Sequence, residues 1–207
     1  MYNFSYRSIK LLYMTCKSIY NERLSEIQLK IIFFTPATHI ELKNAVDLWY
    51  YDQNKACKLY NKIETWNTIL INDFSSLFYN LQNFDNYINE WIVANVEYMI
   101  LTFCHARNFN KPLDKWNTKN VKSMAGMFCA TRQFNKNIEN WDVSNVTDMH
   151  IMFKDATDFN CNLQKWDISN VNDMSYMFYN SKFIDKSSLN WNTDSVNITT
   201  GMYYQHR

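Results

Sequence analysis

The chain has few of the residues that usually make turns, with two glycines and two prolines among 207 residues. Its turns must use other residue types, and the 28 asparagines are the natural substitutes, because Asn tolerates left-handed backbone and hydrogen-bonds to its own main chain. No run of 18 apolar residues is present, which argues against a membrane-spanning helix. A formal net charge of +1 lacks the basic excess of a nucleic-acid-binding protein.

A disulfide framework and an export signal are also missing from the pattern. The five cysteines are an odd number without a CxxC pair, and they predict reduced thiols. The first 24 residues are interrupted by basic side chains and lack a small-residue cleavage site, so they do not match a secretory signal. These features favour an intracellular or virion-associated setting.

The dominant feature of the sequence is a repeat. Six of the seven tryptophans are spaced 25 residues apart, and a fixed period of this size predicts stacked structural units. With Trp as position 1, Val or Ile recurs at position 6 and mainly Phe at position 13. We expect the indoles to stack inside the array, and asparagines at position 5 to bond backbone groups of the adjoining coil. The two columns are Trp66, Trp91, Trp116, Trp141, Trp166 and Trp191, and Asn95, Asn120, Asn145 and Asn170.

The spacing within one unit predicts two local elements. Ile138, Trp141 and Val143 follow the rhythm of a short strand that faces a core. Apolar residues within 146–153 recur at three- and four-residue steps, which predicts one or two helical turns. We therefore expect a right-handed, leucine-rich-repeat-like α/β solenoid with one short strand and one short helix in each 25-residue coil.

The repeated phrase also carries a family resemblance. "WDVSNVTDMHIMF" at 141–153 and "WDISNVNDMSYMF" at 166–178 resemble the repeat of BspA-like proteins, a class found among mycoplasma surface proteins. The resemblance covers residues 63–203 and implies a binding or surface role without catalytic residues. The sequence departs from the family pattern in two ways. Its asparagine falls one place earlier than in the usual leucine-rich-repeat frame, and the export signal of cell-surface members is not evident.

The chain divides into a helical cap, residues 1–62, and the repeat solenoid, residues 63–207, with about five and a half coils. A helix over 40–62 is expected to cover the open N-terminal end of the array. A second helix is expected within 5–33, and an irregular final coil around 184–189. The inward face of the covering helix should contain Leu42, Ala45, Val46, Trp49, Ala56 and Leu59.

Metal and catalytic chemistry find little support in the pattern. Cys104 and Cys129 share position 14 of neighbouring coils, which permits a disulfide or a metal site, but zinc needs further ligands and two part-buried thiols are favoured. Aspartates at position 2, Asp142 and Asp167, and at position 8, Asp148 and Asp173, could form two carboxylate rows for calcium. Other residues interrupt both rows, so turn and capping roles are favoured. No nucleophile–base constellation is present, and we expect no catalytic residue, cofactor or metal.

A protein-binding face is expected where positions 2 and 4 of each coil point outward. This face is mostly polar, with a modest apolar patch near its N-terminal end. Its predicted residues are Ile69, Ile92, Ala94, Lys115, Asn117, Lys119, Asp142 and Asp167.

The sequence thus predicts a non-enzymatic structural or protein-interaction solenoid with a protein partner. One setting is a component of a larger assembly such as a large-virus particle. An alternative is an adhesin-like surface module exported by an unrecognised route, and a third, from another class, is a metal-dependent hydrolase. The oligomeric state and the partner stay open.

Overall fold

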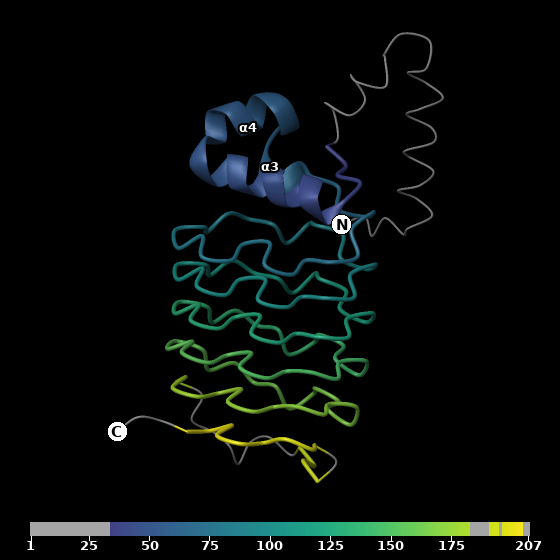
Figure 1. Ribbon diagram of the computed structural model, residues 1–207, viewed down its shortest axis with the longest axis vertical. Coiled ribbons are helices and arrows are strands. Elements are labelled where there is room, and N and C mark those ends of the chain that lie inside the picture. The colour runs from purple at the N-terminus through teal and green to yellow at the C-terminus, as the bar shows by residue number, and fades with distance from the viewer. Residues whose placement is uncertain (1–33, 183–190, 195, 205–207) are drawn as a thin grey trace.

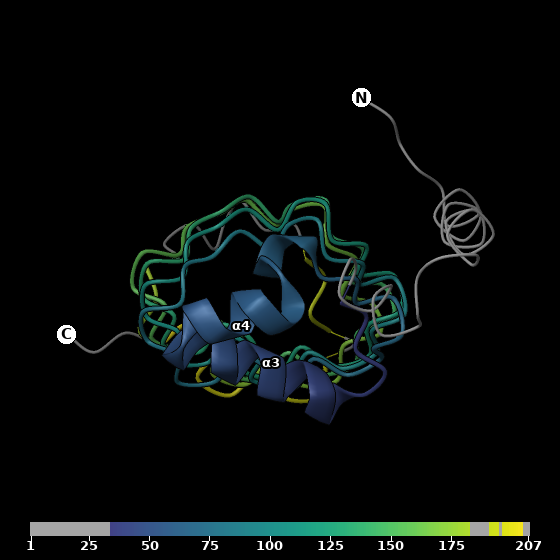
Figure 2. The same cartoon turned by 90° about the horizontal axis from the view of Figure 1, so that it is seen from above.

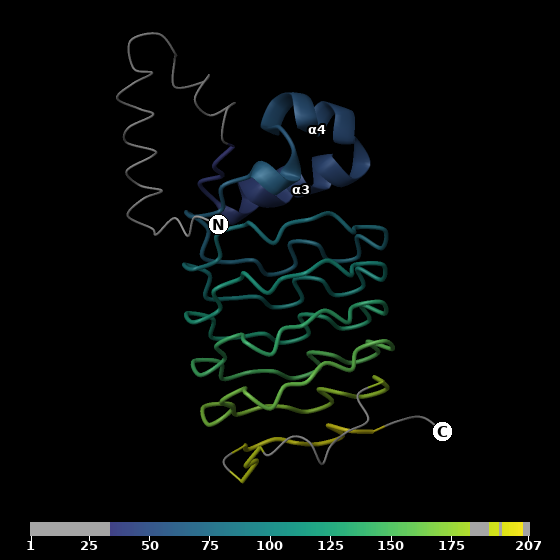
Figure 3. The same cartoon turned by 180° about the vertical axis from the view of Figure 1, so that it is seen from behind.

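The computed structural model describes residues 34–182, 191–194 and 196–204. The chain forms a stack of coils beneath two helices at its N-terminal end, as Figures 1 and 3 show from opposite sides. We number the coils by their tryptophans, from coil 1 at Trp66 to coil 6 at Trp191. The helix expected within 5–33 and the irregularity expected at 184–189 lie outside the described residues.

The covering segment is two helices where the sequence predicts one. Helix α3 spans His39–Tyr51, helix α4 spans Gln53–Tyr60, and a short 3₁₀ turn, η1, spans Ile63–Thr65. Asp52 separates the first two: its backbone N–H closes α3 onto Leu48, and its side chain accepts from the N–H of Lys55 to begin α4. Within the described residues, no helix is long and apolar enough to cross a membrane.

Helix α3 lies across the end of the stack, as the view from above shows (Figure 2). Its buried residues are Leu42, Ala45, Val46 and Trp49, and α4 buries Ala56. Trp49 packs edge-on against Trp66 of coil 1, with ring centroids 6.0 Å apart. Leu59, expected on the inward face, is 48% exposed because it lies on the short second helix beyond the break.

The cap also reaches the backbone of the first coil. His39 Nδ1 lies 3.0 Å from the carbonyl oxygen of Asp73, a hydrogen bond in which the ring nitrogen donates. In later coils the carbonyl at this position accepts from a backbone N–H of the preceding coil, so His39 occupies the place of a missing coil.

The predicted strand in each coil is wrong. Among the described residues there is no strand, and consecutive coils share one isolated parallel β-bridge at position 8. The bridged residues are Asp73, Tyr98, Ser123, Asp148, Asp173 and Ile198. Around the tryptophans the backbone N–H groups close turns within their own coil, Trp141 onto Ile138 and Val146 onto Val143. These donors are therefore not available for a ladder to the next coil.

The predicted helix in each coil is wrong as well. In coil 4 the N–H of Met152 bonds the carbonyl of Met149, and the N–H of Ala156 bonds that of Phe153, so each forms a turn. The N–H groups of Phe153 and Asp155 bond the next coil instead, at the carbonyls of Met177 and Tyr179. A three- and four-residue apolar spacing here comes from successive turns. The α/β solenoid class is therefore incorrect, and the coils are stacked turns.

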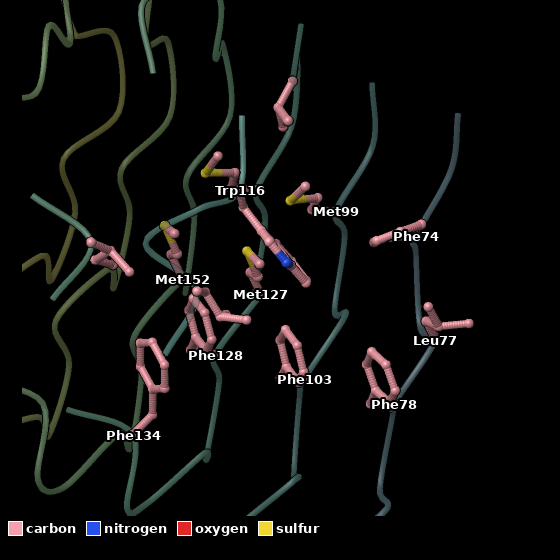
Figure 4. Packing of buried hydrophobic residues seen from close by; sticks show 14 of the residues in the cluster. Phe74, Leu77, Phe78, Met99, Phe103, Trp116, Met127, Phe128, Phe134 and Met152 are labelled. Carbon is pink, nitrogen blue, oxygen red and sulfur yellow. The ribbon is translucent and has the colours of Figure 1, made fainter. Parts of the chain in front are cut away.

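The core is a set of aromatic columns that run through the stack. Figure 4 shows Phe78, Phe103 and Phe128 of successive coils lying face to face. Their centroids are 4.9 and 5.4 Å apart and the rings are within 6° of parallel. All three rings are fully buried, and each aromatic side chain in such a column removes about 150–250 Å² from water. No coil could bury these rings alone, so the stack is stabilised by contacts between neighbours.

Candidate functional site

The tryptophan column is structural. Trp66 and Trp91 stack at 6.0 Å with an interplanar angle of 19°, and Trp116 and Trp141 stack at 6.4 Å and 5°. From coil 2 onward each indole N–H donates to the carbonyl three residues before the preceding tryptophan. The accepting residues are Ile63, Ile88, Leu113, Ile138 and Leu163. The indoles of Trp166 and Trp191 also stack, at 6.4 Å and 13°.

The asparagine column at position 5 links coils by side-chain amides. Each amide Nδ2 donates to the position-4 carbonyl of the preceding coil, at 2.7–2.8 Å. The pairs are Asn95 with Ile69, Asn120 with Ala94, Asn145 with Lys119, and Asn170 with Ser144. These side chains replace the missing backbone ladder around the tryptophans.

The face predicted to bind protein is largely occupied by turn-making side chains. Its position-2 residues Asn117, Asp142 and Asp167 accept the backbone N–H two residues later. The Ser144 hydroxyl and then its N–H hold the pKa of Asp142 below 3.8, and Ser169 does the same for Asp167. Lys115 pairs with Glu90 of the preceding coil and Lys119 is exposed. The apolar members Ile69, Ile92 and Ala94 are half-buried.

Asp148 and Asp173, which the sequence offers as carboxylate rows, lie beside His150. Ligand atoms of the three residues lie within 4.8 Å of one another, the only such trio of His, Cys, Asp or Glu in the described part of the chain. His150 Nδ1 is 3.0 Å from Asp148 Oδ1, which also accepts the His150 backbone N–H. Asp173 accepts the N–H of Ser175 at 2.8 Å. Turn closure accounts for both carboxylates.

Cys104 and Cys129 lie together in a small apolar cluster with Ala130, separate from the main core. The two thiols are free and buried. No third His, Cys, Asp or Glu within the described ranges converges on them, so the zinc alternative lacks its ligands.

A hollow of about 360 Å³ lies at the edge of the stack, and Ala130 of the thiol cluster is among its lining residues. It runs over coils 2 to 5 and is formed by positions 15 and 17 of each coil. Its lining residues are His105, Arg107, Ala130, Arg132, Asp155, Thr157 and Asn180.

Backbone geometry opens this edge. Every position-15 residue of the hollow is left-handed, with φ of 61° at His105, 55° at Ala130, 57° at Asp155 and 54° at Asn180. Each of these residues is the third residue of a four-residue turn. Its backbone N–H donates to the carbonyl at position 14 of the next coil. Ala130 is the smallest side chain of the column, and it leaves space between His105 and Asp155.

Positive charge exceeds negative charge in the lining of the hollow. Arg107 and Arg132 occupy position 17 of adjacent coils, are exposed, and form no ion pair with any described residue. Asp155, the acidic lining residue, accepts a hydrogen bond from the Asn180 amide at 2.8 Å. The arginine backbones are fixed, since their carbonyls accept the N–H groups of Gln133 and Asp158. The two guanidinium groups are therefore exposed to solvent on hydrogen-bonded backbone.

This site is not among the residues predicted from the sequence, although the repeat contains a signal for it. Arg107 and Arg132 are the only arginines between residues 34 and 204, and they are one period apart. Their proximity follows from the repeat itself. The hollow does not, because it depends on the left-handed turn at position 15 and on the small side chain of Ala130.

Comparison with known proteins agrees with the repeat. A family model described as "Mycoplasma protein of unknown function, DUF285" matches residues 48–140 and 113–207. No curated protein and no solved structure matches the chain. The two matches together span 48–207, well over half of the sequence, and include every tryptophan of the repeat. The chain therefore belongs to the DUF285 family of mycoplasma-type repeat proteins, which is BspA-like in the broad sense.

Proposed function

We propose that the chain is a non-enzymatic protein-interaction module that binds an acidic segment of a partner protein in the arginine-lined hollow. The observation that carries this proposal is the pair of exposed guanidinium groups, Arg107 and Arg132, without acidic partners among the described residues. A guanidinium presents two parallel N–H donors that match a carboxylate, and such charge-assisted bonds are about twice as strong as neutral ones.

The spacing of the two arginines suits an extended peptide. Equivalent backbone positions in hydrogen-bonded coils are about 4.8 Å apart, and side chains on one side of an extended peptide recur about every 6.6 Å. The flexible arginine side chains span this difference. A segment lying along the stack axis would place two alternate carboxylates against Arg107 and Arg132.

The remaining lining residues make the two ends of the hollow chemically different. Asp155 lies one coil beyond Arg132, and its negative charge repels a further acidic side chain. Thr157 lies at the same end, and its hydroxyl, which donates to the carbonyl of Arg132 at 3.3 Å, can accept a further hydrogen bond. The proposal therefore favours a partner with two acidic residues followed by a neutral polar one.

The test is fluorescence anisotropy with a labelled peptide of alternating glutamate and serine. We expect the double variant Arg107→Gln, Arg132→Gln to bind at least about tenfold more weakly, because each lost charged hydrogen bond costs about 1.5–3 kcal/mol. Binding by the unaltered chain should also weaken with added salt. The matched control, Lys58→Gln with Lys62→Gln, removes the same charge from exposed positions of the cap, away from the hollow, and should bind normally.

Equal weakening in both double variants would show general charge attraction and would contradict a site in the hollow. A third variant, Ile69→Asp with Ile92→Asp, tests the face predicted from sequence. Loss of peptide binding in that variant alone would move the site from the hollow to positions 2 and 4.

A further inference from the structure

Cys104 and Cys129 occupy the same position of adjacent, hydrogen-bonded coils. On either side of Cys104, the N–H groups of Phe103 and His105 donate to the carbonyls of Met127 and Cys129, both at 2.8 Å. Chain segments joined in this way lie about 4.8 Å apart. This spacing falls inside the range of about 4.4–6.8 Å between the Cα atoms of a disulfide. The backbone is thus already placed for a cross-link.

The pair is buried but lies at the border of the hollow. Cys104 is 3% exposed and Cys129 is 9% exposed, in a cluster with Ala130 and Leu101 outside the main core. Ala130 follows Cys129 directly and lines the hollow. A small oxidant in the hollow therefore reaches the edge of the thiol cluster without any coil separating.

The two sulfurs differ in their acidity. Hydrogen bonding between the thiols lowers the pKa of Cys129 and raises the pKa of Cys104, and burial raises the latter further. Cys129 is therefore the better thiolate, and Cys104 keeps its proton. Because the thiolate is the form that attacks an oxidant, the two residues have separate roles.

We propose that Cys104 and Cys129 are an oxidation site at which hydrogen peroxide converts two thiols into a disulfide between coils 2 and 3. The Cys129 sulfur attacks one peroxide oxygen, the O–O bond breaks, and one water leaves, so that Cys129 becomes a sulfenic acid. The Cys104 sulfur then attacks the Cys129 sulfur, the S–O bond breaks, and the Cys104 proton passes to the departing hydroxide, so that a second water leaves. In balance, two thiols and one peroxide give one disulfide and two waters.

The other described cysteines lack this arrangement. Cys161 is at position 21, where its thiol donates to Asn135 Oδ1 and to the carbonyl of Lys136. Burial raises the pKa of Cys161 to about 11, which keeps it protonated. Cys57 lies in helix α4, outside the repeat, where it packs against the main core. The cross-link is therefore specific to the two position-14 cysteines.

The experiment treats the full chain with an equimolar amount of hydrogen peroxide and counts free thiols after denaturation. We expect the count to fall from five to three, and non-reducing peptide mass spectrometry to show one linked pair containing Cys104 and Cys129. The midpoint of thermal unfolding should rise by about 6–12 °C, because the bond closes a loop of 25 residues in the unfolded chain. Added dithiothreitol should reverse both changes.

Two variants separate this reaction from general oxidation. In Cys104→Ser, Cys129 should stop at the sulfenic acid and react with dimedone, with no internal cross-link. The matched variant Cys161→Ser should form the disulfide as the unaltered chain does. Five thiols after treatment, or a linked pair that survives Cys104→Ser, would overturn the proposal. Neither readout uses the acidic peptide, so the result does not depend on the proposed binding function.

Discussion

The carbonyl of Ile88 accepts two hydrogen bonds from successive tryptophans. The backbone N–H of Trp91 lies 3.1 Å away and closes a turn, and the indole Nε1 of Trp116, from the next coil, also lies 3.1 Å away. Both lone pairs of one buried oxygen are thereby used. The same arrangement recurs at the carbonyls of Leu113 and Ile138. It explains why the column requires an indole and not merely a large ring.

Replacing one indole by a phenyl ring should therefore lower the free energy of unfolding by more than the loss of buried apolar area explains, because a hydrogen bond is lost as well. We expect Trp116→Phe to lower the free energy of unfolding by about 2–3 kcal/mol, of which about 1 kcal/mol is the hydrogen bond to Ile88 and the rest is the cavity. In Trp66 the indole bond, to the carbonyl of Asn61, is longer at 3.4 Å. Trp66→Phe should therefore lower the free energy of unfolding by about 1 kcal/mol less than Trp116→Phe does. Equal costs in urea unfolding would show that the indole bond contributes nothing.

Asparagine and aspartate are not interchangeable in this repeat. The position-2 side chain only accepts, as Asn117 does from the N–H of Lys119 at 3.3 Å, so Asp serves equally well there. The position-5 side chain donates, as Asn120 does to the carbonyl of Ala94 at 2.8 Å, and a carboxylate cannot donate. The repeat accordingly has both residues at position 2, but Asn alone at position 5 of coils 2 to 5.

The matched substitutions Asn120→Asp and Asn117→Asp test this difference. The first removes a donor and sets a carboxylate against a carbonyl oxygen, and should lower the free energy of unfolding by at least about 1 kcal/mol. The second should change it by less than about 0.5 kcal/mol. Chemical unfolding at neutral pH measures both. The assignment of donor and acceptor columns would be wrong if Asn117→Asp proved the more damaging change.

The backbone is left-handed at position 11 as well as at position 15. Both glycines of the chain lie at position 11, Gly126 with φ of 59° and Gly201 with φ of 63°, yet Ser76, Leu101 and Ile151 adopt similar angles. A left-handed conformation costs a residue with a Cβ about 1–2 kcal/mol. The stack thus imposes this conformation on residues that do not favour it.

We expect Gly126→Ala to lower the free energy of unfolding by about 1–2 kcal/mol or more, because a new Cβ would also lie 2.5 Å from Leu101 Cδ2. Adding Leu101→Ala removes that contact, so that the double variant isolates the backbone cost. The converse change, Ser76→Gly, should raise the free energy of unfolding by about 0.4–1 kcal/mol. A loss of stability in Ser76→Gly would contradict strain at this position.

The repeat predicted the register of the stack but not its local structure. The 25-residue spacing of the tryptophans places equivalent residues of successive coils in contact, as the Trp116–Trp141 stack shows. The apolar steps within 146–153 were interpreted as a helix because a helix and a run of turns bury residues at the same three- and four-residue spacing. The deciding feature is the left-handed backbone at Ile151 and Asp155, with φ of 49° and 57°. Ile151 does not favour that conformation, and the sign of it is in other coils, where position 11 is Gly126 or Gly201 and position 15 is Asn80, His105 or Asn180.

The arginine hollow was hidden for a related reason. The predicted binding face lies at the positions that flank the tryptophans, because a strand there would point its side chains outward. In the structure those side chains, such as Asp142, close turns. The open edge is at positions 15 and 17 instead, where the turns end and Ala130 leaves room.

Acid should weaken the turns that use aspartate. The Ser144 hydroxyl holds the pKa of Asp142 below its ordinary value of 3.8, and the Ser169 hydroxyl does the same for Asp167. A carboxyl whose pKa is lower in the folded chain contributes stability above pH 3.8, and this contribution disappears as the pH falls through the lowered value. The double variant Asp142→Asn, Asp167→Asn keeps the turn acceptors but cannot titrate.

We therefore expect the unaltered chain to unfold at a higher urea concentration than this variant at a pH of about 6, and at the same concentration at a pH of about 2. A second variant, Ser144→Ala with Ser169→Ala, removes the main cause of both pKa shifts and should reduce the pH dependence in the same way. Unfolding midpoints that run parallel from pH 6 to pH 2 would show that the hydroxyl bonds do not favour the charged carboxylates. The loss must appear on the acid side, because only there does the folded chain have to take up the protons that these bonds exclude.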